Sequence, residues 1–518
     1  MVIREWVVTI VTLTLFGTLY PHGASAYRIL GFNTSPSRSH VIVQDALMKE
    51  LARRGHHVTM VSPYKEPEQM PNYRKITVPL DPWASDFTKT IFENTNSRLA
   101  MLQLMPEMLR LSTVPVNKTL RSQEFQNLIK EPEGYDLLIT GIMNDAVFGV
   151  SHILKCPVII VCPNAPMAVV NSMVGNPTPI STIPNMMLGL TNPMSFRQRV
   201  ANFAGLLFEE VFAGVWKYYQ RKTYEELFPP GQYPAYDELR SNVSLVFVNH
   251  HFTKGSPRPY VPTMVEVGGL QIKDKPSPLP EDIRQWIDGA EEGVILFSLG
   301  TNLLSSSIPP ELLSAILETF RNIKQRVIWK WDTHDMPNKP ANVMLVDWLP
   351  QDDILAHPNV RLFIMHGGLG GIAEALFHGV PIVGIPMFGD QPVNLAQVEK
   401  EGWAYVLQYT ELTVETFSKA INEVLHDPRY RENVKRLSQL FRDRPQSAMD
   451  TAIYWTEYVI RHKGASHLRY PGADMNFIQR HSLDVMGFVA FMTFVIFKAI
   501  SLSCSWCCRR SVAKLKKQ

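Results

Sequence analysis

The stretch from Asn359 to Gln397 constrains the fold of this chain more than any other. It contains an apolar run that ends at Met365, a glycine-rich turn, a helical segment terminated by Gly379, and a second apolar run from Pro381 to Ile385. Short apolar runs separated by a helical pattern are typical of parallel strands that are buried on both faces. The stretch therefore predicts a strand–loop–helix–strand unit of a doubly wound α/β sheet.

The turn of this unit reads His366-Gly367-Gly368, and Gly371 follows in the predicted helix. Glycines at such a turn let backbone N–H groups approach an anion at the helix N-terminus. The turn alone is weak evidence for phosphate binding. Together with Glu374, Asp390 and Gln391 on the same strand–helix–strand unit, it favours a nucleotide-sugar site. The chain has no GxGxxG after a predicted strand, no HExxH and no paired CxxC. A dinucleotide dehydrogenase and metal enzymes of those types are therefore unsupported.

The same stretch resembles the signature of the UDP-glycosyltransferases, the membrane-bound glucuronosyl- and glucosyltransferases of animals. The residues that match at the family spacing are His366, Gly367, Gly368, Glu374, Gly379, Pro381, Pro386, Asp390 and Gln391. The resemblance implies an α/β architecture of GT-B type, with two Rossmann-like domains facing a cleft and a C-terminal transmembrane helix. It also implies an enzyme that transfers a hexose from a UDP-sugar to a hydroxyl of a small lipophilic acceptor, with inversion at the anomeric carbon.

Donor-binding residues are expected in three places. A turn of small residues follows an apolar strand before Ser298, and a Trp-Leu-Pro-Gln motif begins at Trp348. The resemblance implies that the first turn meets the diphosphate with the His-Gly-Gly loop, and that the motif binds uracil. The implied donor residues are Ser298, Gly300, Thr301, His366, Gly367, Gly368 and Gly371 on the phosphate side, Trp348 and Gln351 at uracil, Glu374 at the ribose, and Asp390 and Gln391 at the sugar.

The N-terminal half begins with a second βαβ pattern, and His40 lies at its first strand–helix junction. Ligands of doubly wound sheets bind at that edge. An imidazole suits the removal of a proton from an acceptor hydroxyl, because its pKa lies near neutrality. A single histidine there is otherwise only a residue of the first helical turn. The resemblance places the family's general base in this Ser-His pair, so His40 is the predicted base.

The carboxylate partner of His40 is left open. Counted without gaps, the position of the family's catalytic aspartate is Gly141, and the nearest carboxylate is Asp145. Asp145 could fold back toward His40, or it could cap the helix that starts near Ala146. Without the aspartate, a non-catalytic UDP-sugar-binding membrane protein is an alternative function. The missing aspartate and the Ser-Arg-Ser-His loop also resemble insect members, which favour UDP-glucose, although the Asp-Gln pair serves glucose and glucuronate alike.

Both ends of the chain carry targeting patterns. Residues 1–26 contain an apolar run followed by Ala24-Ser25-Ala26, as in a secretory signal peptide. Residues 483–504 are long and apolar enough to span a bilayer, and residues 505–518 form a basic tail that belongs in the cytoplasm. Lys514 and Lys516 match a dilysine retrieval pattern. The expectation is a single-pass type I protein of the endoplasmic reticulum, with its catalytic part in the lumen.

The chain length predicts several domains. Residues 27–270 are expected to bind the acceptor, residues 281–440 the UDP-sugar, and residues 441–482 to form C-terminal helices, with a proline- and lysine-rich link at 268–280. Sequons at Asn33, Asn117 and Asn242 predict glycosylation. The net charge of +3 gives no indication of a nucleic-acid partner. No motif requires a metal or a cofactor, the UDP-sugar is a co-substrate, and a homo-oligomer is possible.

Overall fold

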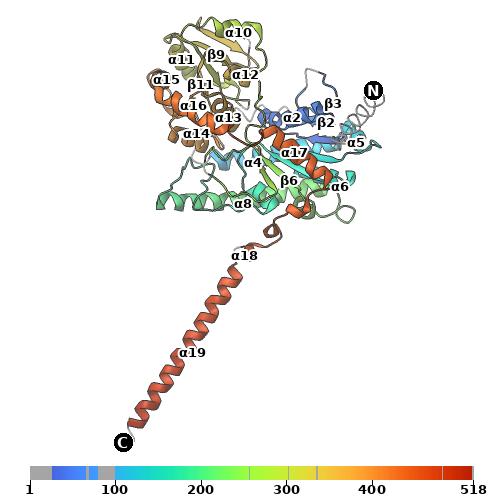
Figure 1. Cartoon of the computed structure of the whole chain (residues 1–518), viewed down its shortest axis with the longest axis vertical. Coiled ribbons are helices and arrows are strands. Elements are labelled where there is room, and N and C mark those ends of the chain that lie inside the picture. The colour runs from blue at the N-terminus through green and yellow to red at the C-terminus, as the bar shows by residue number, and fades with distance from the viewer. Residues whose placement is uncertain are drawn as a thin grey trace, which may run out of the picture.

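The computed structural model describes residues 26–65, 69–79, 100–255, 257–301, 303–333, 336–480 and 482–515. The expected signal peptide, apart from Ala26, and Lys516 with the rest of the extreme C-terminus lie outside the described residues. Two parallel sheets, each covered by helices, form the globular part, and a long helix leaves it at the C-terminus (Figure 1).

Among the described residues, the N-terminal sheet has seven strands in the order β3-β2-β1-β4-β5-β6-β7, all of them parallel. The strands are β1 (Arg28–Phe32), β2 (His57–Ser62), β3 (Tyr73–Thr77), β4 (Leu137–Gly141), β5 (Val158–Cys162), β6 (Leu245–Val248) and β7 (Met264–Glu266). Continuous apolar runs make β4 and β5 fully buried, as a sheet with helices on both faces requires. The sheet therefore presents its loops, including the one before His40, at its carboxyl edge.

Helices cover both faces of this sheet. They are α2 (Arg38–Arg53), α4 (Ala100–Arg121), α5 (Gln123–Leu128), α6 (Phe148–Leu154), α7 (Ala168–Val174), α8 (Phe196–Leu227) and α9 (Tyr236–Ser241), with a short 3₁₀ helix η2 (Asp145–Val147). The predicted first helix is confirmed as α2, and it buries Val43, Leu47 and Leu51 on one face. The βαβ start of the doubly wound fold is confirmed by the parallel pairing of β1 with β2.

In the described part of the second domain, the sheet has six parallel strands in the order β10-β9-β8-β11-β12-β13. They are β8 (Val294–Ser298), β9 (Arg326–Lys330), β10 (Val343–Val346), β11 (Val360–Met365), β12 (Ile382–Gly384) and β13 (Ala404–Val406). The surrounding helices are α10 (Glu281–Asp288), α11 (Pro310–Arg321), α12 (Gln351–Leu355), α13 (Leu369–His378), α14 (Gln391–Lys400), α15 (Val414–His426) and α16 (Pro428–Arg442).

The strand–loop–helix–strand unit predicted from the sequence is β11–α13–β12. Its two strands pair in parallel, with Phe363 opposite Ile382. Gly379 ends α13 in the left-handed conformation, with φ of 70°, which glycine adopts without the steric cost of a Cβ atom. The unit places the His-Gly-Gly turn at the carboxyl edge of the second sheet.

After the second domain the chain returns to the first through α17 (Ala448–Arg461), which lies beside α2 (Figure 1). Ala452, Ile453 and Val459 are buried in the same apolar cluster as β1, β2 and α2. Arg54 of α2's C-cap forms an ion pair with Asp450 of α17. The C-terminal segment thus completes the core of the first domain and ties the two domains together.

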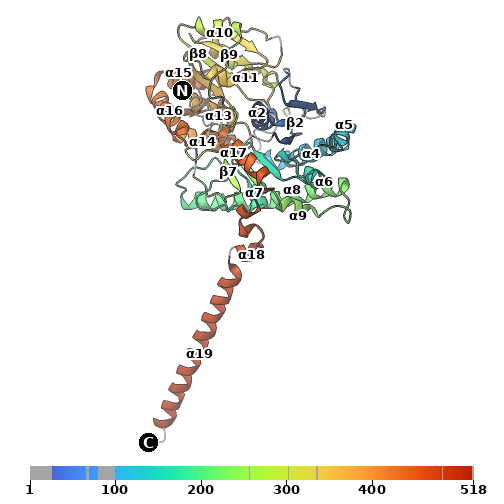
Figure 2. The same ribbon diagram turned by 45° about the vertical axis from the view of Figure 1, so that its right-hand side comes forward.

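A last helical segment leads away from the globular part. It comprises α18 (Phe477–Arg480) and α19 (Leu483–Leu515). Within α19, Leu483–Trp506 is long and apolar enough to cross a membrane, and none of it is buried against the rest of the protein. The two views in Figures 1 and 2 show α19 projecting from the side of the molecule that carries α8. The helix fits the transmembrane segment expected at residues 483–504.

We predict that Ile453→Ala destabilises the N-terminal domain, because the side chain is only 2% exposed and lies in that domain's core. Truncation of a buried isoleucine to alanine costs about 2–5 kcal/mol. The measurement is the unfolding midpoint of that domain in detergent. Leu440→Ala is the matched control, because Leu440 is exposed on α16. Equal midpoints for the two variants would show that α17 is not part of this core.

Candidate active site

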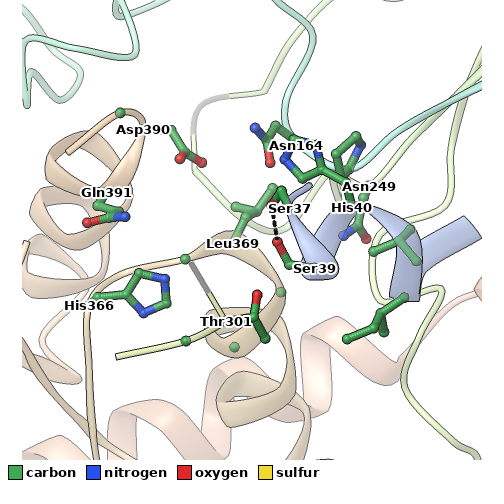
Figure 3. Close-up of a pocket in the computed structure, with 18 of the residues that line it drawn as sticks. Ser37, Ser39, His40, Asn164, Asn249, Thr301, His366, Leu369, Asp390 and Gln391 are labelled. Atoms are coloured by element: carbon green, nitrogen blue, oxygen red, sulfur yellow. Dashed lines mark hydrogen bonds between the residues drawn. The ribbon is translucent and has the colours of Figure 1, made fainter. Parts of the chain in front are cut away.

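A cavity of about 1180 Å³ lies between the carboxyl edges of the two sheets (Figure 3). The first domain contributes His40, Asn164 and Asn249 to its wall. From the second domain come Ser298, Gly300, Thr301, Trp348, Gln351, His366, Gly368, Gly371, Glu374, Asp390 and Gln391. Ligand pockets of single small molecules are ~300–1,000 Å³. The cavity is therefore large enough for a nucleotide sugar and a second substrate.

His40 lies in the first turn of α2 and, like Asn249, lines the cavity (Figure 3). Burial lowers the pKa of His40 to about 4, because the charged imidazolium loses hydration there. The Nδ1 atom is buried and has no hydrogen-bond partner among the described residues. The imidazole is therefore neutral at neutral pH, as a general base must be, but no carboxylate in the described part of the chain bonds to its Nδ1 atom.

Asn33 occupies the space that an aspartate at position 141 would need. A Cβ atom on Gly141 would lie 2.5 Å from Nδ2 of Asn33. This Nδ2 donates to Oε1 of Gln44 at 3.0 Å and to the carbonyl oxygen of His40 at 3.4 Å. A neutral amide network on β1 and α2 thus replaces the carboxylate and anchors the main chain of His40.

The prediction that Asp145 orients His40 is wrong. The Asp145 carboxylate is buried, accepts a hydrogen bond from the Tyr236 hydroxyl at 2.7 Å, and lies 3.5 Å from Nε of Arg240. The alternative as a helix cap is also wrong, because Asn144 occupies the cap position of η2. The reason is the turn after β4, where Met143 adopts a positive φ and the chain then enters the layer of helices around α9. Asp145 is a structural residue of that layer.

The predicted glycosylation site at Asn33 is also wrong for the folded protein. Asn33 is 1% exposed, and its Nδ2, the atom that would carry the glycan, is held in the network with Gln44. Asn117 lies within α4 and donates to Oε2 of Glu226 at 3.4 Å. Asn242 is exposed at the end of α9. Glycosylation of Asn117 and of Asn242 stays a prediction.

Gln351 and Glu374 form the centre of the donor-side wall. Nε2 of Gln351 donates to Oε2 of Glu374 at 2.6 Å. Gln271, from the link between the domains, reaches Oε1 of Glu374 at 3.4 Å and the carbonyl oxygen of Gly370 at 3.3 Å. Burial raises the pKa of Glu374 to about 7. Sequence reasoning missed Gln271, because its link segment carries no motif of its own.

Trp348 is 43% exposed and stands at the mouth of the cavity as a stacking surface. The guanidinium carbon of Arg38 lies 3.4 Å from the centre of its ring. Arg38 belongs to α2 of the first domain, so this stacked pair bridges the two domains. It shows that the indole presents a flat face to a planar group, as the stacking of a nucleobase requires.

The His366 ring packs between the two glycine turns of the second sheet. Cβ atoms at Gly300 and Gly368 would lie 2.5 and 2.7 Å from this ring, so no larger residue fits at either position. Gly367, which precedes Gly368 in the chain, has φ of 93° and packs against Leu395. Burial lowers the pKa of His366 to about 4. The ring is thus a neutral hydrogen-bonding group between the turns.

The N-terminus of α13 and Thr301 supply donors for an anion. Gly368 caps α13 without a side-chain hydrogen bond, which leaves the first backbone N–H groups of the helix available. The Thr301 hydroxyl is buried and has no partner among the described residues. His366 and Thr301 both line the second-domain wall of the cavity (Figure 3). This set of donors suits a diphosphate.

Asp390 and Gln391 stand at the start of α14. The Gln391 Oε1 accepts from the backbone N–H groups of Met387 and Phe388 at 2.8 and 3.0 Å, so this side chain shapes its own loop. The Asp390 carboxylate accepts from Nδ2 of Asn394 at 2.8 Å. Lys254, which the sequence did not single out, is buried nearby with Nζ 3.4 Å from the Leu369 carbonyl oxygen. Burial lowers the pKa of Lys254 to about 7, while Glu401 and Asp390 oppose that shift.

Comparison with known proteins shows the family of this chain. The sequence profile described as UDP-glucoronosyl and UDP-glucosyl transferase matches residues 32–518. The chain belongs to the UDP-glycosyltransferase family. It is 35% identical to UDP-glycosyltransferase UGT5 of Dactylopius coccus, over 96% of this chain and 95% of that one. It is 30% identical to UDP-glucuronosyltransferase 2B14 of Oryctolagus cuniculus, over 88% and 89% of the two chains.

Solved structures confirm the GT-B fold of this UDP-glycosyltransferase. The glycosyltransferase of kitacinnamycin aligns with a TM-score of 0.55 at 19% identity, covering 83% of this chain and 99% of that one. The calicheamicin glycosyltransferase CalG4 aligns with a TM-score of 0.53 at 18% identity, covering 84% and 99%. The protein is therefore an enzyme that uses a UDP-sugar donor and an acceptor.

We predict that Asp145→Ala destabilises this glycosyltransferase without removing its activity. The change leaves the Arg240 guanidinium buried beside an empty site, and breaking a buried pair costs about 3–5 kcal/mol. The thermal midpoint should fall, while turnover per folded molecule stays near that of the parent. Asp145→Asn is the control, since its amide oxygen still accepts from Tyr236. Loss of turnover at an unchanged midpoint would restore Asp145 to the catalytic site.

Proposed function

We propose that this UDP-glycosyltransferase transfers glucose from UDP-glucose to a hydroxyl of a small lipophilic acceptor, with inversion at the anomeric carbon. One observation carries the proposal: a single continuous cavity has the neutral, half-buried His40 on one wall and the proposed donor-binding side chains on the other. UDP-glucose is a co-substrate in this scheme, and the proposed mechanism uses no metal or other cofactor.

The proposed reaction is one displacement. His40 takes the proton of the acceptor hydroxyl as its oxygen attacks the anomeric carbon, and the bond from that carbon to the diphosphate oxygen breaks. UDP leaves with the bonding electron pair. The α13 N-terminus and the Thr301 hydroxyl supply fixed donors for the charge that develops on the diphosphate. The base and the leaving group lie on opposite domains, which supports attack from the face opposite to UDP.

Glucose is the proposed sugar because of the charges around Asp390. An ionised carboxylate accepts strong hydrogen bonds from neutral hydroxyls, but it repels the carboxylate of glucuronate. The nearby cation, Lys254, lines a second, smaller cavity of about 80 Å³. It is absent from the wall of the main cavity. Lys254 therefore offsets the charge of Asp390 from outside the main cavity. It is poorly placed to bind the carboxylate of a bound glucuronate.

The acceptor side supports a lipophilic substrate. Its wall includes Met108, Leu111, Val169, Val170, Met186, Met187, Phe212 and Trp216. Methionine is unbranched and adapts to irregular apolar shapes. A hydroxyl-bearing apolar molecule can therefore fill this wall and direct its oxygen toward His40.

We further propose residence in the endoplasmic reticulum membrane as a single-pass type I protein. The span in α19 supports membrane anchoring. The basic residues after it, including Arg509, Arg510 and Lys514, favour a cytoplasmic tail. This orientation places both domains and the cavity in the lumen.

We predict that His40→Ala lowers turnover by ~10²–10⁴, the usual contribution of a general base, while UDP still inhibits with its parental affinity. At saturating UDP-glucose, turnover of the parent enzyme should hold as the pH falls through 6.5, the ordinary pKa of imidazole. It should decline only toward about 4, because burial keeps the pKa of His40 that low and the neutral ring persists above it. Unchanged turnover in His40→Ala would exclude it as the base.

We predict that Asp390→Ala sharply weakens the use of UDP-glucose, because its carboxylate accepts from the sugar hydroxyls. Inhibition by free UDP should stay nearly intact. Gln351→Ala is the matched control from the uracil side of the wall, and it should weaken UDP inhibition and sugar transfer together. Equal losses of UDP inhibition and transfer in Asp390→Ala would place the aspartate at the nucleotide instead.

A further inference from the structure

The longest helix of the globular part, α8, carries an exposed apolar stripe. The stripe consists of Phe196, Val200, Phe203, Leu207, Val211, Val215 and Tyr218, which recur every three or four residues and are between 36% and 73% exposed. This spacing keeps all seven side chains on one face. At 1.5 Å per residue, the stripe is roughly 33 Å long. A continuous exposed apolar surface of this size indicates an interaction site.

The opposite face of α8 is committed to the protein core. Asn202, Glu209, Ala213, Trp216 and Gln220 are buried there, and Nδ2 of Asn202 donates to the carbonyl oxygens of Ile180 and Ile183. The helix is therefore fixed in place and cannot turn its stripe inward. A helix with this buried polar face is also unsuited to crossing a bilayer, and among the described residues only Leu483–Trp506 qualifies as a span.

The direction of the stripe points to its occupant. In both Figure 1 and Figure 2, which differ by a rotation about the vertical axis, α8 runs across the bottom of the globular part and α19 descends from the same side. The core lies above α8, so the stripe faces the side on which α19 would enter the membrane. Met475 and Ile478, 45% and 53% exposed, add apolar side chains in the segment that leads from α17 into α19.

Basic and aromatic residues complete the pattern of an interfacial helix. Lys222 follows the stripe at the same spacing and is exposed, and exposed Arg197 lies beside its first residue, Phe196. Long cationic side chains can extend to lipid headgroups while their stems stay on apolar surface. A helix that is apolar on one face, with basic residues at its ends, typically lies in the plane of the interface.

We propose that the stripe of α8 rests in the interface of the same bilayer that α19 spans. The occupant is lipid, and the globular part is held against the membrane at two points, α19 and α8. Because α8 also supplies Glu209, Phe212 and Trp216 to the cavity wall, docking brings the acceptor side within about one helix diameter, ~10–12 Å, of the lipid. The proposal itself needs no catalytic activity.

The test uses the full-length protein with Cys504, Cys507 and Cys508 replaced by serine, which removes the cysteines of the membrane-proximal segment. Leu207→Cys is labelled with an environment-sensitive fluorophore and reconstituted into phosphatidylcholine vesicles that carry nitroxide groups high on the acyl chains of both leaflets. Leu440→Cys, exposed on α16 of the second domain, is the matched control. We expect quenching by the nitroxide lipid to be several-fold stronger at position 207 than at position 440.

The unfolding midpoint of each labelled variant, compared with the unlabelled parent, shows that the fold is intact, and both positions are exposed. Equal quenching at the two positions would overturn the proposal. A blue-shifted emission at position 207 without nitroxide quenching would also overturn it, because the stripe would then be covered by protein, such as a second copy of this chain. Both readouts are independent of sugar transfer, so a failure of the proposed function leaves this test unaffected.

Discussion

The structure depends on one constraint: the carboxyl edges of its two sheets face each other across a single cavity. His40 comes from the first sheet, and the donor-binding wall comes from the second. Neither edge forms the whole wall of the cavity, so the spacing of the two domains sets the distance from His40 to the side chains of the second domain. Contacts between the two domains include Arg38 on Trp348, Lys254 at the Leu369 carbonyl oxygen, Gln271 at Glu374, and Lys400 at the Asn192 carbonyl oxygen. The return of α17 onto α2 also joins the C-terminal segment to the core of the first domain.

The second feature of the site is burial of its ionisable groups. Burial lowers the pKa values of His40 and His366 to about 4 and raises that of Glu374 to about 7. Each shift favours the neutral form, because the cavity removes water from the charged one. Such shifts concentrate at functional sites. The neutral His366 ring can meet a charged diphosphate as a hydrogen-bonding group, although the Asp390 carboxylate lines the same wall.

Local patterns in the sequence were sufficient to predict β11–α13–β12 and the position of His40, because strand, turn and helix signals are contiguous there. The partner of His40 was not predictable. The turn at Met143 directs Asp145 into the layer of helices around α9. Asn33 fills the space beside Gly141, and it can do so because β1 and β4 are neighbours in the sheet. Lys254 was missed for the same reason, since its burial arises from packing of the second domain against a loop of the first.

In the proposed mechanism, a base on one domain drives direct displacement of UDP bound to the other. The most direct test is the anomeric configuration of the first product formed from UDP-α-glucose, read by proton NMR from the coupling of the anomeric hydrogen during early turnover. Attack from the face opposite to UDP predicts a β-glucoside alone. An α-glucoside would contradict the account, because it requires either a second displacement or attack from the same face as the leaving group.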